Sequence, residues 1–542
     1  MNKLIFLSVI LSFTVGNLSG QYESGMTYPD TTSELLIDSL DVSALLANTI
    51  LEEDLYNHLS ILASDEFEGR ETGTRGNTRA AKYIANYFKE LGIKPRGIEN
   101  SYYQDVAFNK TYWTETKVEV NGNAYRHLWD YMTFPSMTDQ FQELSSDEVI
   151  FLGYGIDDQS YSDYKGNDVQ GKIIMINKGE PFNQDSISYI SSTRESSEWT
   201  SDINMKLKVA QEKGVKMVLI IEEDLRKLLD KNRRFLVSPS LKLGDGEMKT
   251  RTHANHMYIS SNVAKDIIGN KDEKIKKWRK KNLKNGKACD IKLNSQLGIQ
   301  LSKKKNVLKG HNVFAFIEGT DLKEEVIAVS AHYDHLGKRG EDIFNGADDN
   351  GTGTSTVLEI TEALTEAIKK GIRPRRSILL LLVTGEEKGL LGSRYYAENP
   401  IYPIENTVAN VNIDMIGRTD KKHEENPNYT YVIGSDRLSS DLHKINEEIN
   451  HKYSRLILDY QYNGEDDPNR YYYRSDHYNF AKKGIPAIFF FSGTHEDYHR
   501  PSDTVDKIMF DKLTKIGRHV FHLIWDLANR NDRIIVDGKV EN

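Results

Sequence analysis

The stretch "RRSILLLLVTGEE" (375–387) decides the fold. Its apolar run is continuous rather than alternating, which is typical of a strand buried on both faces of a parallel sheet. Three further runs have the same character, namely "EEVIAVSAHYD" (324–334), "NTVANVNIDMIG" (406–417) and "IPAIFFFSG" (485–493). Helical spacing follows these runs, ending in an amphipathic helix near 505–530. The alternation predicts an α/β fold with a mostly parallel sheet sandwiched by helices.

The pattern of predicted secondary structure changes between residues 120 and 300. Short β-rich runs such as "EVIFLGYGI" and "GKIIMINKG" precede a helix and a strand there, which indicates a separate, smaller α/β unit. The flanking segments 51–119 and 301–531 contain all the candidate functional motifs. We therefore expect one discontinuous catalytic domain (51–119 and 301–531) that is interrupted by an inserted domain at 120–300.

The N-terminus has the pattern of a secretory signal peptide. Lys3 precedes an apolar stretch, and small residues close the segment before Gln21. We expect residues 1–20 to be a signal peptide, residues 21–50 to be a leader, and the protein to be exported, to a periplasm or out of the cell. No later segment approaches about 20 uninterrupted apolar residues, so no membrane span is expected.

Composition narrows the classes of function. The 542 residues are 38% hydrophobic and 28% charged, with a formal net charge of -9 and a pI near 6.0. A nucleic acid is disfavoured as a partner because phosphate binding needs a basic face. The lysine-rich run 271–287 is the exception, and it favours a solvated helix face. The single cysteine, Cys289, excludes an intrachain disulfide and a thiolate-rich zinc site.

Ionisable side chains gather where the predicted strands end. Sites in open α/β sheets form outside the carboxyl ends of the strands, so these side chains should meet at one rim. A single such residue is usually a turn or surface group, but here five segments coincide. They contribute His332, Asp334, His335, Asp348, Asp349, Glu386, Glu387, Asp414 and "THEDYHRPSD" (494–503).

This set of carboxylates and imidazoles suits two divalent cations, above all zinc, that share one carboxylate. Glu386 and Glu387 can then have different roles, because neighbouring residues at a strand end point to different sides. One binds metal, and the other takes the proton of a bridging water.

The motifs "AHYDH", "GADDNGTG", "TGEEKGLLGS", "NIDMIGR" and "HRPSDT" resemble those of the co-catalytic di-zinc aminopeptidases, secreted zinc exopeptidases with transferrin-receptor-like relatives. The resemblance covers roughly 51–118 and 305–530, and the middle segment resembles the protease-associated insert domain. It implies hydrolysis of peptides with a free N-terminus by a water activated between two Zn²⁺ ions. It implies His332 and Asp414 on one zinc, Glu387 and His499 on the other, Asp349 as the bridge, Glu386 as general base, and Asp334 as the residue that orients His332.

The resemblance leaves other residues in less direct roles. His335 is expected at the rim of the site, and Asp476 and His477 of "RSDH" are expected behind the ligands. The acidic loop at Glu465, Asp466 and Asp467 is a candidate for binding the substrate amine, although a loop of this composition is commonly a solvated turn.

Two alternatives remain open. "HEDYH" (495–499) matches the helical H-E-x-x-H zinc motif with Glu496 as base, although Pro501 disfavours a helix there. The other alternative is a relative that binds one metal, as glutaminyl cyclases do, or a receptor-like relative without catalysis. Both expected glutamates and all five expected ligands are present, which favours the two-metal enzyme.

Overall fold

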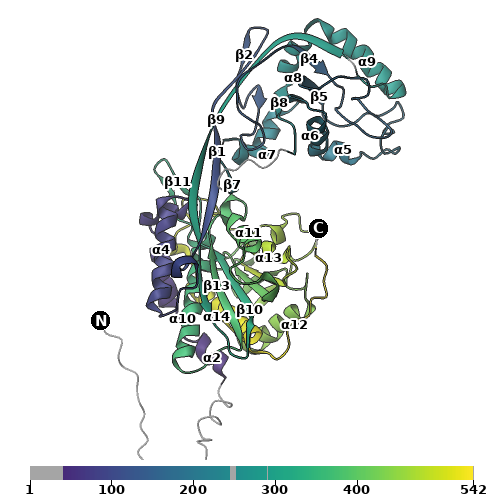
Figure 1. The fold of residues 1–542 in the computed structure, drawn as a ribbon. Coiled ribbons are helices and arrows are strands. Elements are labelled where there is room, and N and C mark those ends of the chain that lie inside the picture. Colours follow the sequence, from purple (N-terminus) through teal and green to yellow (C-terminus); the bar gives the residue numbers. More distant parts are fainter. Residues whose placement is uncertain (1–40, 238, 245–251, 290, 541–542) are drawn as a thin grey trace, which may run out of the picture.

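The computed structural model describes residues 41–237, 239–244, 252–289 and 291–540. The expected signal peptide at 1–20 and most of the leader at 21–50 lie outside the described residues. Two lobes are joined by two long strands, β1 (Tyr103–Val120) and β9 (Ile291–Ile317), which run from the lower lobe into the upper one (Figure 1).

The lower lobe contains the mostly parallel sheet that the sequence predicts. Its strands follow the order β16-β15-β17-β14-β10-β13-β9, in which β10 is parallel to both of its neighbours, and β14 and β17 are also parallel. The pairings β15 with β17 and β13 with β9 are antiparallel. The strands are β10 (Leu322–His332), β13 (Arg376–Val383), β14 (Thr407–Ile413), β15 (Tyr429–Ile433), β16 (Ile457–Asp459) and β17 (Ala487–Phe491).

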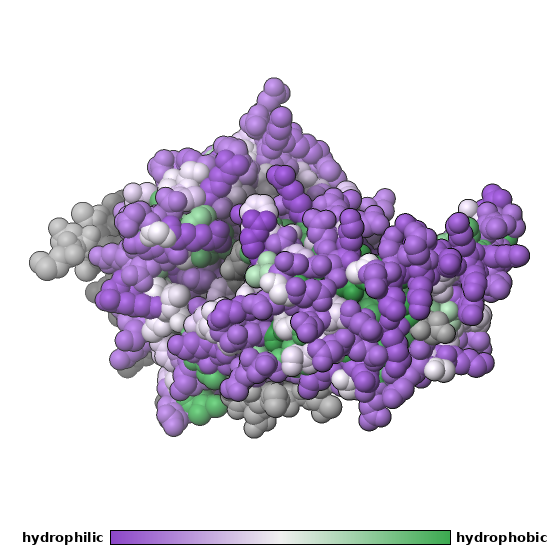
Figure 2. Space-filling model, turned by 90° about the horizontal axis from the view of Figure 1, so that it is seen from above, coloured by the Kyte–Doolittle hydropathy of each residue, from purple (hydrophilic) through white to green (hydrophobic). Residues whose placement is uncertain are grey.

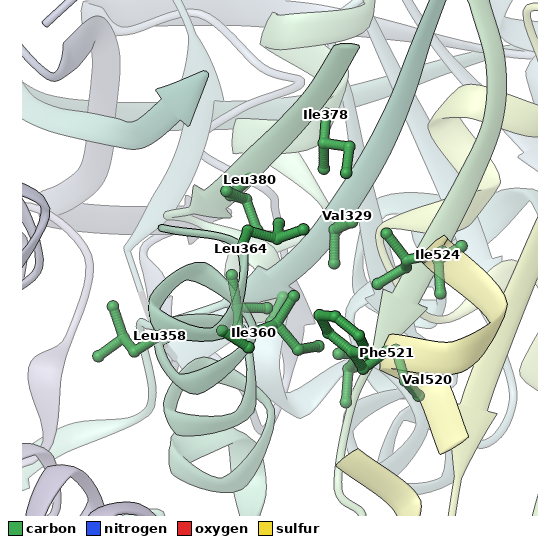
Figure 3. Packing of buried hydrophobic residues seen from close by; sticks show 14 of the residues in the cluster. Val329, Leu358, Ile360, Leu364, Ile378, Leu380, Val520, Phe521 and Ile524 are labelled. Carbon is green, nitrogen blue, oxygen red and sulfur yellow. The ribbon is translucent and has the colours of Figure 1, made fainter. Parts of the chain in front are cut away.

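Both faces of this sheet are buried, which explains the continuous apolar runs. Alternate residues of β13 point to opposite sides, so that Ile378 and Leu380 enter one core while Leu379 and Leu381 enter another. Figure 3 shows the first core, where residues of β10 and β13 pack against two helices. The helical residues that face these strands are Ile360, Leu364, Val520, Phe521 and Ile524, whereas Leu358 lies on the other side of its helix.

Helices cover the sheet on both sides. The larger core lies under helices from both ends of the chain, and it includes Leu46 and Ala47 of the N-terminal helix α2. The opposite face packs against Tyr396 and Phe480. The helices on the first side are α2 (Val42–Ala47), α3 (Glu52–Leu62), α4 (Arg75–Glu90), α10 (Gly353–Lys369), α12 (Ser440–Ile449) and α14 (Phe510–Asn529), and those on the second are α11 (Leu391–Glu398) and α13 (His477–Ala481).

The upper lobe has its own parallel strands and its own cores. Strands β4, β5, β6 and β8 lie side by side, with one apolar cluster on each face. The lysine-rich run forms α9 (Asp272–Asn285), which buries Ile275 and Trp278 and exposes its lysines, as expected for a solvated helix face. The other elements are β3 (Tyr131–Met132), β4 (Phe141–Phe151), β5 (Ile173–Asn177), β6 (Met217–Glu222), β8 (His256–Ser260), α5 (Glu198–Ser201), α6 (Ile203–Glu212), α7 (Leu225–Val237) and α8 (Ser261–Ile268).

The two lobes share one continuous sheet. Strands β1 and β9 pair in antiparallel register from Tyr103↔Val313 to Val120↔Leu297, with a register shift between Trp113 and Glu115. The expected boundaries near 119/120 and 300/301 fall inside these paired strands. Strand β7 (Ser240–Leu243) also pairs with β1, and its leucines pack against α11 of the lower lobe.

The face of the molecule seen from above is largely hydrophilic, and its hydrophobic residues are scattered in small areas (Figure 2). No helix among the described residues combines the length and the apolar composition that crossing a membrane requires.

Candidate metal centre

The parallel register brings the predicted site residues to one rim of the sheet. His332, the last residue of β10, lies opposite Val383, the last residue of β13, and Asp414 directly follows β14. After β13 the chain turns at Gly385, whose φ of 78° is in the left-handed region that favours glycine. This turn places Glu386 and Glu387 beside the end of β10.

His332 is the centre of a first cluster. Its Nε2 lies 3.3 Å from Asp414 Oδ1, 3.5 Å from Asp349 Oδ1 and 3.9 Å from Glu386 Oε2. Ligand atoms of His332, Glu386 and Asp414 lie within 4.8 Å of one another, as a metal site requires. The opposite oxygen of Asp414 accepts a hydrogen bond of 2.7 Å from Ser475, which holds the carboxylate in place.

A second cluster forms around the other oxygen of Asp349. His499 Nε2 lies 3.1 Å from Asp349 Oδ2 and 3.3 Å from Glu387 Oε1. His335 Nδ1 lies 2.9 Å from the same Glu387 oxygen and 3.7 Å from the same Asp349 oxygen. Because Oδ1 of Asp349 faces the first cluster and Oδ2 faces the second, this carboxylate has the geometry of a bridge.

Asp334 acts on His332 through its main chain. The Nδ1 of His332 lies 3.1 Å from the carbonyl oxygen of Asp334, whereas the nearest carboxylate oxygen is 3.9 Å away. The carboxylate instead accepts hydrogen bonds from Thr72 Oγ1 at 2.7 Å and from the backbone N–H of Glu386 at 3.1 Å. Asp334 therefore fixes both the ring of His332 and the turn that carries Glu386.

A third layer supports the Asp349 loop. The backbone N–H groups of Asp348 and Asp349 both donate to the carboxylate of Asp503, at 3.1 Å. Asp348 accepts a hydrogen bond from the N–H of Gly417 at 2.7 Å and lies 3.3 Å from His495 Nε2. These contacts fix the loop, so the direction of the Asp349 carboxylate is set before any ligand binds.

The site contains more buried carboxylates than neighbouring positive side chains to neutralise them, which favours the binding of cations. Arg70 is a buried guanidinium, but it donates to the carbonyl oxygens of residues such as Tyr333 and Gly346 rather than to the carboxylates. Buried carboxylates are costly unless they are paired or coordinate a metal. The buried carboxylates of the site are those of Asp334, Asp348, Asp349, Glu387, Asp414, Asp476 and Asp503.

The pKa values of the two adjacent glutamates, Glu386 and Glu387, are shifted in opposite directions. Burial raises the pKa of Glu386 well above its usual range, and the negative charges of Glu387 and Asp476 raise it further against the opposing effect of His332. Burial also raises the pKa of Glu387, but contacts with His335 and His499 outweigh this and hold it well below its usual range. Burial would lower the pKa of His499, but its contacts with Asp349 and Glu387 outweigh this and raise it to about 10. Glu387 is therefore suited to bind a cation and Glu386 to carry a proton.

The structure contradicts the helical H-E-x-x-H alternative. Residues 496–499 form a turn and no helix, and His499 has a φ of 58°, so the two histidines do not share a helical face. His495 is buried against Asp348, whereas His499 lies beside Asp349 and Glu387. The physical reason is that the segment follows β17 directly and turns before Pro501.

The separation of these histidines gives a first prediction. His499→Ala should lose about one equivalent of metal per chain, because it removes an imidazole beside two carboxylates of the second cluster. His495→Ala should retain both equivalents, because its contact is with Asp348. Metal can be measured by mass spectrometry after dialysis, and equal losses from the two variants would contradict the assignment.

The acidic loop turns out to be a solvated turn. Glu465 and Asp466 are exposed, and Asp467 accepts hydrogen bonds from the backbone N–H groups of Asn469 and Tyr471. Its carboxylate therefore closes a local turn and does not line the metal clusters.

Asp476 and His477 are fully buried behind the ligands, as expected. Burial and nearby Asp414 and Asp334 raise the pKa of Asp476 to about 7, against the opposing effect of His332. His335 was expected at the rim, and this expectation is wrong: the side chain is fully buried inside the second cluster. The reason is that the chain continues past His332 beneath Arg70, whose carbonyl accepts the N–H of His335.

A pocket opens beside the clusters, and sequence reasoning did not identify most of its walls. It is small and open to solvent, and aromatic side chains form one side. The alternation of Phe489 and Phe491 along β17 is the one sequence signal that points to a shared face. Besides ligands of both clusters, the walls comprise Glu386, Met415, Tyr471, Arg474, Phe489, Phe491, Thr494 and Tyr498.

The segment that carries this site is similar to known peptidases. Residues 312–524 match the model of Peptidase family M28. A protein of Trichophyton verrucosum named "Probable leucine aminopeptidase" is 30% identical over 212 residues, which cover 38% of this chain and 55% of that protein. "Aminopeptidase YwaD" of Bacillus subtilis is 26% identical over 230 residues, which cover 41% of this chain and 46% of that protein. The chain thus spans about half the length of the curated relatives it matches.

A solved structure has the same fold. The aminopeptidase from Aneurinibacillus sp. strain AM-1 aligns with 92% of this chain and with 100% of its own, at a TM-score of 0.54 and 19% identity. At this identity the likeness concerns the fold, which extends across both lobes.

Proposed function

We propose that this protein is a zinc-dependent exopeptidase, most specifically an aminopeptidase that removes N-terminal residues from peptides, in keeping with the match of residues 312–524 to the model of Peptidase family M28. The single observation that carries the proposal is the Asp349 carboxylate, whose two oxygens face two separate clusters of ligand atoms. Such a shared carboxylate is how two cations are held a few ångströms apart.

The donor set fits zinc. Imidazole nitrogen and carboxylate oxygen are both normal zinc ligands, and their mutual distances of 3.1–3.5 Å match ligands about 2.0–2.1 Å from a common ion. His332 and Asp414 would hold one zinc and Glu387 and His499 the other, with Asp349 shared. Bound there, the two ions would supply an activated water and polarise the scissile carbonyl.

Glu386 is the proposed general base. It lies at the edge of the first cluster, where its Oε2 is 3.9 Å from His332 Nε2, and it also lines the pocket. Its carboxylate would accept a proton from the attacking water and give it to the leaving amine. Burial raises the pKa of this carboxyl group, which favours its protonated form. The hydrogen bond from its backbone N–H to Asp334 fixes the turn from which this carboxylate extends.

The surroundings of the site support a peptide substrate. The aromatic wall at Tyr471, Phe489 and Phe491 offers apolar contact to a side chain, and the carboxylates beside it can accept hydrogen bonds from a free α-amine. The upper lobe contains none of these residues. We therefore propose that residues 120–300 form an insert domain that restricts access or binds partners, and that the chain is exported, as its N-terminal pattern indicates.

The proposal is tested by metal analysis together with a substrate panel. The purified protein should bind two zinc ions per chain, release the chromophore from aminoacyl anilides, and lose this activity on treatment with a chelator. Amino-blocked peptides and N-terminal glutaminyl peptides belong in the same panel. Hydrolysis of blocked peptides, cyclisation of the glutaminyl peptides, or two bound metals with no turnover of any free-amine substrate would each overturn the aminopeptidase assignment.

A further inference from the structure

The second cluster contains one imidazole more than the proposed mechanism uses. His335 lies three residues beyond His332, yet its ring is directed at the other cluster. Its Nδ1 lies 2.9 Å from Glu387 Oε1 and 3.7 Å from Asp349 Oδ2. The ligand atoms of these three residues all lie within 4.8 Å of one another.

The ring of His335 is fully buried, and neither of its nitrogens has a hydrogen-bond partner among the described residues. Glu387 Oε1 is likewise buried without a hydrogen bond there, although the two atoms are only 2.9 Å apart. A buried nitrogen and a buried oxygen this close, without the alignment of a hydrogen bond, are costly unless a third atom satisfies both. A cation bound to both atoms would satisfy them.

The backbone is adapted to hold this ring in place. Gly346 has a φ of 56°, and a side-chain carbon at that position would lie 2.5 Å from ring atoms of His335. On the other side, the N–H of His335 reaches the carbonyl of Arg70, whose guanidinium in turn binds the carbonyl of Gly346. Gly346 on one side and Arg70 on the other therefore hold His335 in an orientation in which its ring faces the carboxylates of Asp349 and Glu387.

From this arrangement we propose that His335 is a further ligand of the second metal, so that this metal is held by two imidazoles, His335 and His499, together with Asp349 and Glu387. Both rings contact the same two oxygens, at 2.9–3.7 Å, close to the roughly 3.3 Å expected between neighbouring ligands of a tetrahedral zinc ion. The first metal has His332 as its one imidazole. The two sites therefore differ in ligand type, and the second should bind softer cations more tightly.

The inference rests on the proposed two-metal function, and it is tested on metal binding itself. His335→Ala should weaken binding of the second metal by about 100-fold or more, beyond the 10- to 100-fold typical of losing an outer-shell partner. In the Co²⁺-substituted protein the same variant should change the visible absorption of one of the two ions, because a nitrogen ligand is lost.

Two variants serve as controls. His335→Asn keeps an N–H group near the position of Nδ1 but supplies a poor metal ligand, so it should behave like His335→Ala. His519→Ala removes another fully buried imidazole, whose two nitrogens contact Ser454 and Asn446 rather than a residue of either cluster. It should retain both metals, which shows that lost stability alone does not release the ion.

The outcomes separate the inference from the proposed function. Normal affinity and an unchanged Co²⁺ spectrum in His335→Ala would overturn the inference, and recovery in His335→Asn would overturn it in favour of a hydrogen-bonding role. If the unaltered protein binds two metals but hydrolyses no substrate, the function fails while a lost metal in His335→Ala still supports the ligand. If the unaltered protein binds fewer than two metals, both fail.

Discussion

Glu386→Gln is expected to lower turnover by a factor of about 10² or more while both metals stay bound. The amide has nearly the same shape as the carboxylate, but it cannot accept the proton of the attacking water. The backbone N–H of residue 386 still donates to Asp334, so the turn should keep its position. Turnover is measured with an aminoacyl anilide, and metal content by mass spectrometry on the same preparation.

The neighbouring glutamate provides the matched control. Glu387→Ala removes a carboxylate that contacts both imidazoles of the second cluster, so it should lower the metal content. The two variants should therefore differ: Glu386→Gln should lose turnover with both metals bound, whereas Glu387→Ala should lose metal. An active Glu386→Gln variant, or full metal in Glu387→Ala, would contradict the roles given to this pair.

Asp349→Ala should have the largest effect on metal binding, because it removes a ligand from both clusters at once. Each site should be weakened by more than the 10- to 100-fold that loss of an outer-shell partner costs. After dialysis the variant should retain little of either ion and show no measurable turnover. Loss of one equivalent alone would show that Asp349 serves a single metal.

The adjacent carboxylate again offers a control. Asp348 is as deeply buried as Asp349. Its carboxylate, however, accepts a hydrogen bond from the N–H of Gly417 and lies beside His495, which is not one of the proposed metal ligands. Asp348→Asn should keep both metals, and it can lower stability through its altered contacts with the loop. Comparing the two variants separates the loss of a bridging ligand from damage to the loop that carries it.

The lower-lobe sheet could be predicted because burial on both faces leaves a signature in each strand. The runs ending at His332, Val383 and Ile413 are rich in apolar residues, and each of the three strands pairs with a neighbour on both sides. The long strands β1 and β9 left no such signature. Residues 112–117 of β1 and 302–309 of β9 are exposed or half-buried, and other parts of both strands alternate between buried and more exposed residues, so the sequence did not show where one lobe ends and the other begins.

The site was predictable to the extent that parallel strands end together. His332, Glu386, Glu387 and Asp414 follow directly from that rule. The position of His335 did not follow, because a turn after the strand decides which way its ring points, and that turn depends on Arg70, which is distant in sequence. The aromatic wall was missed for a similar reason. Tyr471 and Tyr498 come from loops, where no periodicity relates a side chain to the sheet.

The paired ribbon of β1 and β9 has a mechanical consequence. A flexible linker would let the upper lobe take many orientations relative to the lower lobe. Two hydrogen-bonded strands are stiffer, because they have a preferred curvature and twist. The register shift at Trp113 is the natural point of bending, since a bulge locally disrupts the ladder. The apolar packing of Leu241 and Leu243 on Leu391 braces the ribbon below that point. The upper lobe should therefore fluctuate around one preferred orientation relative to the lower lobe.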